Sequence, residues 1–167
     1  MPFVITRNYR VALTHSVVLV YPDLYGPALP PAAQQALRTF PQSGGTLIAT
    51  GAVGAGLDGV FGIGRVQASR AESHLRFGAN ALAPRGPGFR TLQISAAATT
   101  ENALGVYRYR QLRAPALANY GDGTAAIVLR RYRSRGAACA IGLDLGFFFL
   151  KGYGNHAQGA NLPRQSF

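Results

Sequence analysis

Four glycines follow a short apolar run near residue 50, with the spacing of a nucleotide-binding loop. Residues 46–50 (TLIAT) are typical of a buried strand, and Gly54, Gly56 and Gly59 then form a GxGxxG pattern after Gly51. In dinucleotide-binding domains such a loop opens a helix whose N-terminus holds the pyrophosphate. Residues 60–64 (VFGIG) make a poor helix, so the sequence favours a plain glycine-rich loop that lines a crevice. Thr50 and Gly51 are therefore candidate ligand contacts.

Residues that perform covalent or metal chemistry are few. A nucleophile elbow would place Ser or Cys after the strand, but residues 51–54 read GAVG. The single cysteine, Cys139, lies in the apolar run 137–142 and is expected to act as a small buried hydrophobic side chain. Asp144 is expected to pair with an arginine or with backbone N–H groups. The histidines have no zinc-binding spacing (His15, His74 and His156). We assign no catalytic residue, no metal and no cofactor.

A polar, glycine-rich segment lies close to the end of the sequence. Residues 151–159 (KGYGNHAQG) contain Tyr153, Asn155 and His156, which are residue types that contact sugars and other small ligands. The alternative interpretation is a linker that leaves the domain. The sequence predicts either a weak ligand site at these three residues or a connection to a further domain.

The chain is strongly basic. It has 17 Lys and Arg against six Asp and Glu, which gives a net charge of +11, and Lys151 is its only lysine. A surface of this kind attracts polyanions. A genome with GC-rich codons also replaces lysine by arginine throughout, so the charge has two open explanations.

Arginine alternates with tyrosine in two segments, 107–110 (YRYR) and 130–135 (RRYRSR). Basic and aromatic residues interleaved in this way bind phosphates and stack on bases. An ordinary amphipathic edge strand has the same pattern, with Tyr107 and Tyr109 facing the core. An arginine-rich nucleic-acid or polyanion module is therefore the alternative function, and five arginines are its candidates: Arg108, Arg110, Arg130, Arg131 and Arg133.

Residues 16–50 have the pattern of a β–α–β unit. The β-branched run 16–21 (SVVLVY) predicts a buried parallel strand, and 46–50 predicts a second one. Between them, Pro31 suits the first turn of a helix over 32–40, and Pro41 ends it. Such a unit is almost always parallel and right-handed.

The second half of the chain has the pattern of strands. Segments 65–68, 74–77, 89–95, 103–109, 124–132 and 137–145 are separated by Gly, Pro, Asn and Asp, and 119–123 (NYGDG) predicts a turn. The most apolar stretch, 138–150, is too short to span a bilayer, and the N-terminus does not have the pattern of a signal peptide.

Two groups of segments resemble a known family. Residues 19–22 (LVYP) and 43–51 (SGGTLIATG) resemble a class I glutamine-amidotransferase-like domain, in the non-catalytic form found, for example, as the trimerisation domain of some β-galactosidases. Residues 130–146 and 151–156 resemble the segment before the catalytic domain of certain bacterial polysaccharide-deacetylase-like proteins. The resemblance covers residues 16–159, but an amidotransferase's cysteine and its His–Glu pair are missing at the matching places.

The resemblance implies a fold and a domain organisation. We expect an α/β fold, with a partial parallel flavodoxin-like or amidotransferase-like sheet and a β-rich C-terminal extension. Residues 1–61 would hold the βαβ part, 62–150 the extension, and 151–167 a linker toward a further C-terminal domain. On this interpretation the chain is a fragment.

The resemblance also implies a function. The chain would be a non-catalytic accessory domain of a carbohydrate-active, polysaccharide-deacetylase-like protein at the cell envelope or outside the cytoplasm. It would position a deacetylase-type catalytic domain, contact glycan, or form a homo-oligomer.

Overall fold

The β–α–β unit expected over residues 16–50 is present. Strand β1 (Val17–Val20) is followed by helix α2 (Pro31–Thr39), the 3-10 turn η2 (Pro41–Ser43) and strand β2 (Thr46–Thr50), and β1 pairs with β2 in parallel. This is a computed structural model, and it describes residues 4–20, 29–69, 72, 74–78, 91–93 and 106–143. A short helix, α1 (Tyr9–Ala12), precedes β1, and the Asn8 side chain caps it by accepting a hydrogen bond from the Arg10 N–H.

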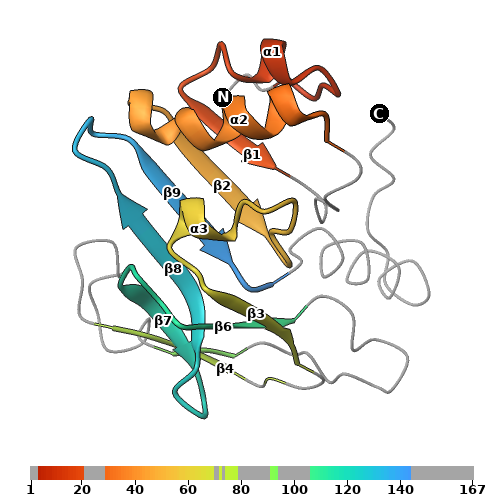
Figure 1. Cartoon of the computed structure of the whole chain (residues 1–167). Coiled ribbons are helices and arrows are strands. Elements are labelled where there is room, and N and C mark those ends of the chain that lie inside the picture. The colour runs from red at the N-terminus through yellow and green to blue at the C-terminus, as the bar shows by residue number, and fades with distance from the viewer. Residues whose placement is uncertain are drawn as a thin grey trace, which may run out of the picture.

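The described residues form one mixed sheet of nine strands (Figure 1). Its main path runs β1-β2-β9-β8-β7-β4-β5, and β9 (Ala137–Ile141) pairs with β2 in parallel. The remaining pairs are antiparallel. They are formed by β3 (Arg65–Ala68), β4 (His74–Phe77), β5 (Thr91–Gln93), β6 (Tyr107–Arg110), β7 (Ala116–Tyr120), and β8 (Ala125–Arg131). The β3–β6 ribbon joins the sheet through Tyr109, which pairs with Ala125 on β8.

The expected flavodoxin-like α/β fold is therefore wrong: the described chain is mostly strand. After β2 the only helix among the described residues is α3 (Asp58–Phe61). It ends after one turn because Gly62 adopts a left-handed conformation with φ 75°. A second long helix would have been needed to continue the alternation of strands and helices. The chain instead makes antiparallel strands, and β9 returns to supply the third parallel strand.

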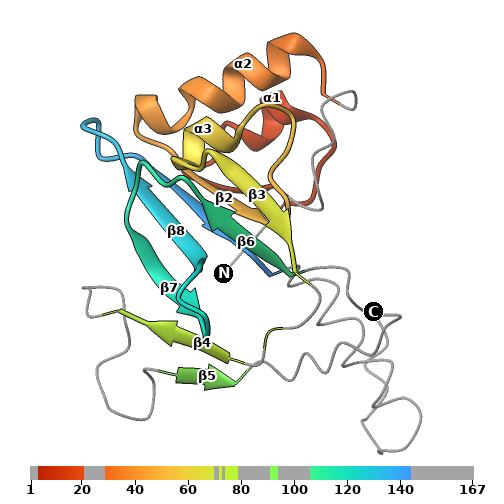
Figure 2. The same ribbon diagram turned by 60° about the horizontal axis from the view of Figure 1, so that its bottom comes forward.

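The main core lies between the sheet and helices α2 and α3, which share one face of it (Figure 2). It contains Leu37 of α2, Phe61 of α3, Leu47 of β2 and Val128 of β8. A second cluster joins β4, β7 and β8, and consists of Leu75, Val106, Tyr120, Ala126 and Leu143. The two clusters make the sheet a rigid support for the side chains on its surface.

No helix in the described ranges is long and apolar enough to cross a membrane. The division into 1–61, 62–150 and 151–167 stays a prediction, and the last of these segments lies outside the described residues.

Candidate functional site

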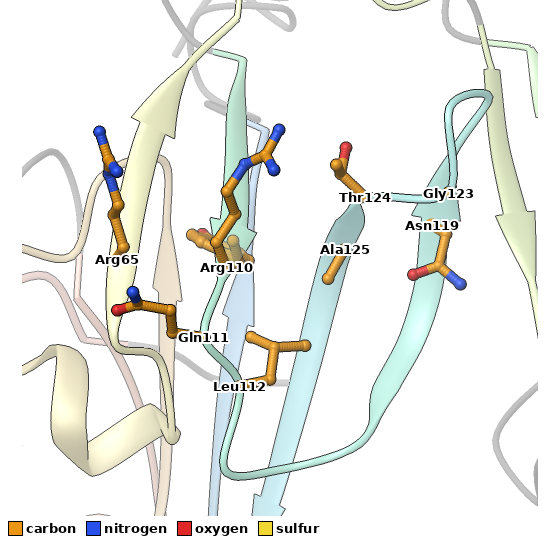
Figure 3. A pocket seen from close by; sticks show the side chains of 9 residues that line it. Arg65, Arg110, Gln111, Leu112, Asn119, Gly123, Thr124 and Ala125 are labelled. Carbon is orange, nitrogen blue, oxygen red and sulfur yellow. The ribbon is translucent and has the colours of Figure 1, made fainter.

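A shallow cationic groove lies where the β3–β6 ribbon meets β7 and β8. We call it the arginine groove. Its volume is about 510 Å³, and it is lined by Arg65, Tyr109, Arg110, Gln111, Leu112, Asn119, Gly123, Thr124 and Ala125. Figure 3 shows the guanidinium groups of Arg65 and Arg110 projecting in the same direction from neighbouring strands.

The alternation of the two strands places these arginines. Arg65 and Arg110 are directly opposite each other in the antiparallel register, and Val66 is opposite Tyr109. Tyr109 is only 1% exposed and Val66 packs against the main core, so their neighbours point to the other face. The inward orientation expected of Tyr109 is thus present. Both arginines are exposed.

Gln111 follows Arg110 in an unusual backbone conformation. Its φ is +53°, in the left-handed region that residues with a side chain seldom adopt. This turn ends β6, and Figure 3 shows the Gln111 side chain on the β3 side of the groove, below the two guanidinium groups. Non-glycine residues in this region cost roughly 1–3 kcal/mol each, and Ala55 and Arg135 adopt it as well among the described residues.

Arg108, two residues earlier on β6, is already paired. Its guanidinium lies 2.5 Å from Oε1 of Glu72, whose side chain is 6% exposed, and 3.3 Å from Oδ2 of Asp122. Ser69 also donates to the same oxygen of Glu72 at 2.9 Å. Among the described residues, by contrast, no carboxylate lies within salt-bridge distance of Arg65 or Arg110.

The remaining candidate arginines do not join the groove. Arg130 donates to the carbonyl oxygen of Gly59 and lies 4.9 Å from the centre of the Tyr132 ring. Arg131 is at the end of β8 remote from Ala125, and Arg133 lies in the turn that follows; both are exposed. The five arginines predicted from the sequence therefore do not form one surface, and Arg65 was missing from the prediction.

The glycine-rich loop after β2 is closely packed. Gly51, Gly54 and Gly56 have φ values of 73°, 63° and 66°, and Val53 and Leu57 are buried. The Tyr109 hydroxyl donates to the Gly51 carbonyl at 2.7 Å, while Thr50 is 3% exposed and its Oγ1 has no hydrogen-bond partner. Gly51 thus contacts β6 through Tyr109, and neither Thr50 nor Gly51 lines the arginine groove.

Asp58 and Cys139 are two further titratable groups whose pKa is shifted by burial. Burial raises the pKa of the Asp58 carboxyl, and a hydrogen bond from the backbone of Gly54 partly offsets that rise. Burial also raises the pKa of the Cys139 thiol, which disfavours a reactive thiolate. Within the described ranges no three His, Cys, Asp or Glu side chains are grouped as metal ligands. Asp144, Tyr153, Asn155 and His156 lie outside the described residues.

The second surface of interest is the sheet face away from α2 and α3. We call it the open sheet face and define it by Val17, Leu19 and Ile48. The register pairs Leu19 with Ile48 on one face and Val18 with Leu47 on the other. Val17 and Leu19 are 49% and 58% exposed, whereas Val18 is 8% exposed. In the described part of the sheet, β1 pairs only with β2, so it is an edge strand.

Comparison with known proteins finds a similar fold in several solved structures. No protein-family model and no curated protein sequence matches the chain. Solved structures match with low identity. They include an exo-β-1,4-mannosidase from Opitutaceae bacterium strain TAV5, at 12% identity and a TM-score of 0.54, covering 86% of this chain and 23% of that one.

Two further solved structures also match the chain. A β-galactosidase from Rahnella sp. R3 matches at 21% identity and a TM-score of 0.51, covering 86% of this chain and 23% of that one. A cytoplasmic protein from Salmonella typhimurium LT2 matches at 12% identity and a TM-score of 0.58, covering 90% and 72%. The chain thus spans less than a quarter of the length of the matched glycoside hydrolases.

These matches correct the resemblance drawn from the sequence. The structural neighbours are glycoside hydrolases and a cytoplasmic protein, rather than glutamine amidotransferases or polysaccharide deacetylases. The assignment to an amidotransferase-like domain of a deacetylase-like protein is therefore wrong. The short motifs that suggested it, such as 43–51, belong to a turn and a buried strand that many sheets share. At these identities, the matches show a shared fold.

Proposed function

We propose that this chain is a non-catalytic accessory domain of a carbohydrate-active protein, and that it holds a glycoside-hydrolase-type catalytic domain against its open sheet face. The observation that carries the proposal is the exposed edge strand β1, on which Val17 and Leu19 lie side by side at 49% and 58% exposure.

The composition of β1 is typical of an edge strand that packs against another domain or chain. Exposed edges normally carry charged residues or proline, which prevent pairing with other chains. β1 reads VVLV and has neither, although the chain contains 16 arginines and ten prolines. The neighbouring Ile48 on β2 is partly buried and continues the apolar surface. A contiguous apolar surface with unpaired strand backbone favours a protein partner.

The shared fold supports a catalytic domain as that partner. In the mannosidase and the β-galactosidase named above, the matched part is 23% of a longer chain. A fold that recurs as a minor part of such enzymes is suited to packing on another domain. In the Salmonella protein the matched part is 72% of the chain, so this fold does not occur only as a small part of a large enzyme. A direct test of the contact is therefore needed.

Site-specific photo-cross-linking tests the proposal. A photoreactive amino acid replaces Leu19 in the protein as its own cells produce it, and the cross-linked peptides are identified by mass spectrometry. The matched control replaces Gln35, which is exposed on α2 over the other face. We expect cross-links from position 19, and not from 35, to a glycoside-hydrolase-type catalytic domain.

Three outcomes would overturn the proposal. Cross-links between two copies of this chain would make the face a homo-oligomer interface. Equal yields from positions 19 and 35 would remove the face as a specific contact. Release of sugar by the purified chain, from a glycan that glycoside hydrolases cleave, would show that the chain is itself catalytic.

The alternative function, an extended nucleic-acid surface, has weaker support. Arg108 is paired with two carboxylates, and Arg130 is bound to a backbone carbonyl and a tyrosine ring. Tyr109, which would have to stack on a base, is 1% exposed.

A further inference from the structure

We propose that the arginine groove binds the carboxylate of an acidic sugar, so that the accessory domain recognises a uronic-acid-bearing polysaccharide. The proposal that the ligand is a sugar rests on the proposed function. The proposal that the sugar carries a carboxylate rests on Arg65 and Arg110.

The two arginines lie opposite each other on neighbouring strands, and no carboxylate of the described residues lies within salt-bridge distance of either. Residues opposite each other in an antiparallel pair have Cβ atoms roughly 4.5–5.5 Å apart, and like charges there destabilise the sheet. Two acids of the described residues that lie beside the ribbon, Glu72 and Asp122, are bound to Arg108 instead. A carboxylate bound between Arg65 and Arg110 would remove their repulsion and gain charge-assisted hydrogen bonds from two planar donors.

The rest of the groove offers groups that bind hydroxyls. Gln111, Asn119 and Thr124 line it. The two side-chain amides can donate and accept, and the Thr124 hydroxyl, which donates to Asp122, can accept. Gly123 has φ 84°, and an added Cβ would meet no atom within 4 Å, so this wall of the groove is open. An acidic sugar presents a carboxylate beside several hydroxyls, which is the combination that this lining fits.

Among the described residues, Asp122 is the acid that lies beside the groove. Its Oδ1 accepts from the hydroxyl of Thr124 at 2.6 Å and from the Thr124 N–H at 2.9 Å, and its Oδ2 faces Arg108. The hydrogen bonds from Thr124 are the largest cause lowering the pKa of Asp122; Arg110 adds to the effect. Since these groups already bind Asp122, its carboxylate forms no salt bridge with Arg65 or Arg110. It interacts with Arg110 only through longer-range electrostatics.

A compact carboxylate fits better than a nucleic-acid strand. Strand binding needs aromatic faces and a run of free cations. The tyrosine of the groove is buried with its hydroxyl bound to Gly51, and only two of the arginines on this ribbon face are without a salt bridge in the described chain.

Isothermal titration calorimetry tests the inference at fixed ionic strength. The probes are oligogalacturonate, a neutral galacto-oligosaccharide of the same length, and single-stranded DNA of the same charge. We expect the protein to bind oligogalacturonate with at least about tenfold higher affinity than either of the others. Arg65→Gln and Arg110→Gln should each weaken oligogalacturonate binding roughly tenfold to hundredfold, the effect of one charge-assisted contact.

Arg133→Gln is the matched control, because it removes the same charge from an exposed turn beyond the far end of β8. It should change affinity less than about twofold. An equal loss in Arg133→Gln, equal binding of the neutral oligosaccharide, or tighter binding of the DNA would overturn the inference. Circular dichroism of each variant verifies the fold, and a conservative Arg110→Lys variant should retain part of the affinity.

The two proposals fail separately. If position 19 gives no specific cross-links but oligogalacturonate binds, only the proposed contact with a catalytic domain is wrong. If position 19 cross-links specifically but oligogalacturonate does not bind, only the proposed ligand of the arginine groove is wrong.

Discussion

The pair formed by Glu72 and Arg108 should be a main support of the β3–β6 ribbon, and Glu72→Gln tests this. The variant keeps the shape of the side chain and removes its charge. Glu72 is 6% exposed, Arg108 is 25% exposed, and the two side chains approach to 2.5 Å. Breaking a fully buried ion pair costs roughly 3–5 kcal/mol. Because Arg108 is partly exposed and keeps Asp122 at 3.3 Å, we expect a loss of about 2 kcal/mol.

Urea unfolding followed by circular dichroism at neutral pH measures this loss, which corresponds to a fall in Tm of about 4–8 °C for a chain of this size. Asp122→Asn is the comparison, since Asp122 is 42% exposed and should lose less than about 1 kcal/mol. In a double-mutant cycle with Arg108→Gln, the effect of Glu72→Gln should fall to half or less. A Glu72→Gln variant as stable as Asp122→Asn, or effects that simply add, would refute the reasoning.

Three other predictions follow from the described contacts. Gly136→Ala should lose about 3 kcal/mol of stability in the same unfolding assay, because its Cβ would lie 2.0 Å from the Pro41 carbonyl oxygen; Gly59→Ala has open space in α3 and should be neutral or slightly stabilising. The folded pKa of Asp122 is depressed, so its contribution to stability is present above the unfolded pKa, about 4, and is lost as pH falls through the folded value. The free energy of unfolding of Asp122→Asn should therefore change less with pH than that of the wild type in that acid range. Cys139 should react with a thiol reagent at pH 8 more slowly than a free cysteine, because burial raises its pKa; an equal rate would contradict this packing.

The local part of the fold could be predicted from sequence because its signals are local. Pro31 and Pro41 mark the start and end of α2. The strand-like segments 65–68 and 74–77, which were predicted between turn-forming residues, coincide with β3 and β4. β7 was missed because residues 116–120 (ALANY) carry few β-branched side chains and overlap the turn-forming segment. The parallel pairing of β9 with β2 was missed as well, since it joins segments about 90 residues apart and no short-range pattern encodes it.

The candidate site shows the same division. The outward orientation of Arg110 follows from its alternation with the buried Tyr109, so the sequence suffices for it. The role of Arg65 depends on the register of β3 against β6, and that register appears only once the ribbon is built. The pairing of Arg108 depends on Glu72, which is 36 residues away and has no motif to mark it.

The position of the arginines bears on the cause of the chain's charge. Replacement of lysine by arginine through codon usage changes the residue type and does not choose which positions are basic. A basic residue opposite another one on a neighbouring strand weakens the sheet, so it is disfavoured where it has no use. Arg65 and Arg110 occupy such opposite positions. Arg108, on the same face, forms salt bridges with Glu72 and Asp122, which are two of the six acidic residues in the chain. The net charge of +11 is therefore weak support for an anionic ligand. The location of this pair, which has no salt bridge to any carboxylate in the described ranges, is stronger support.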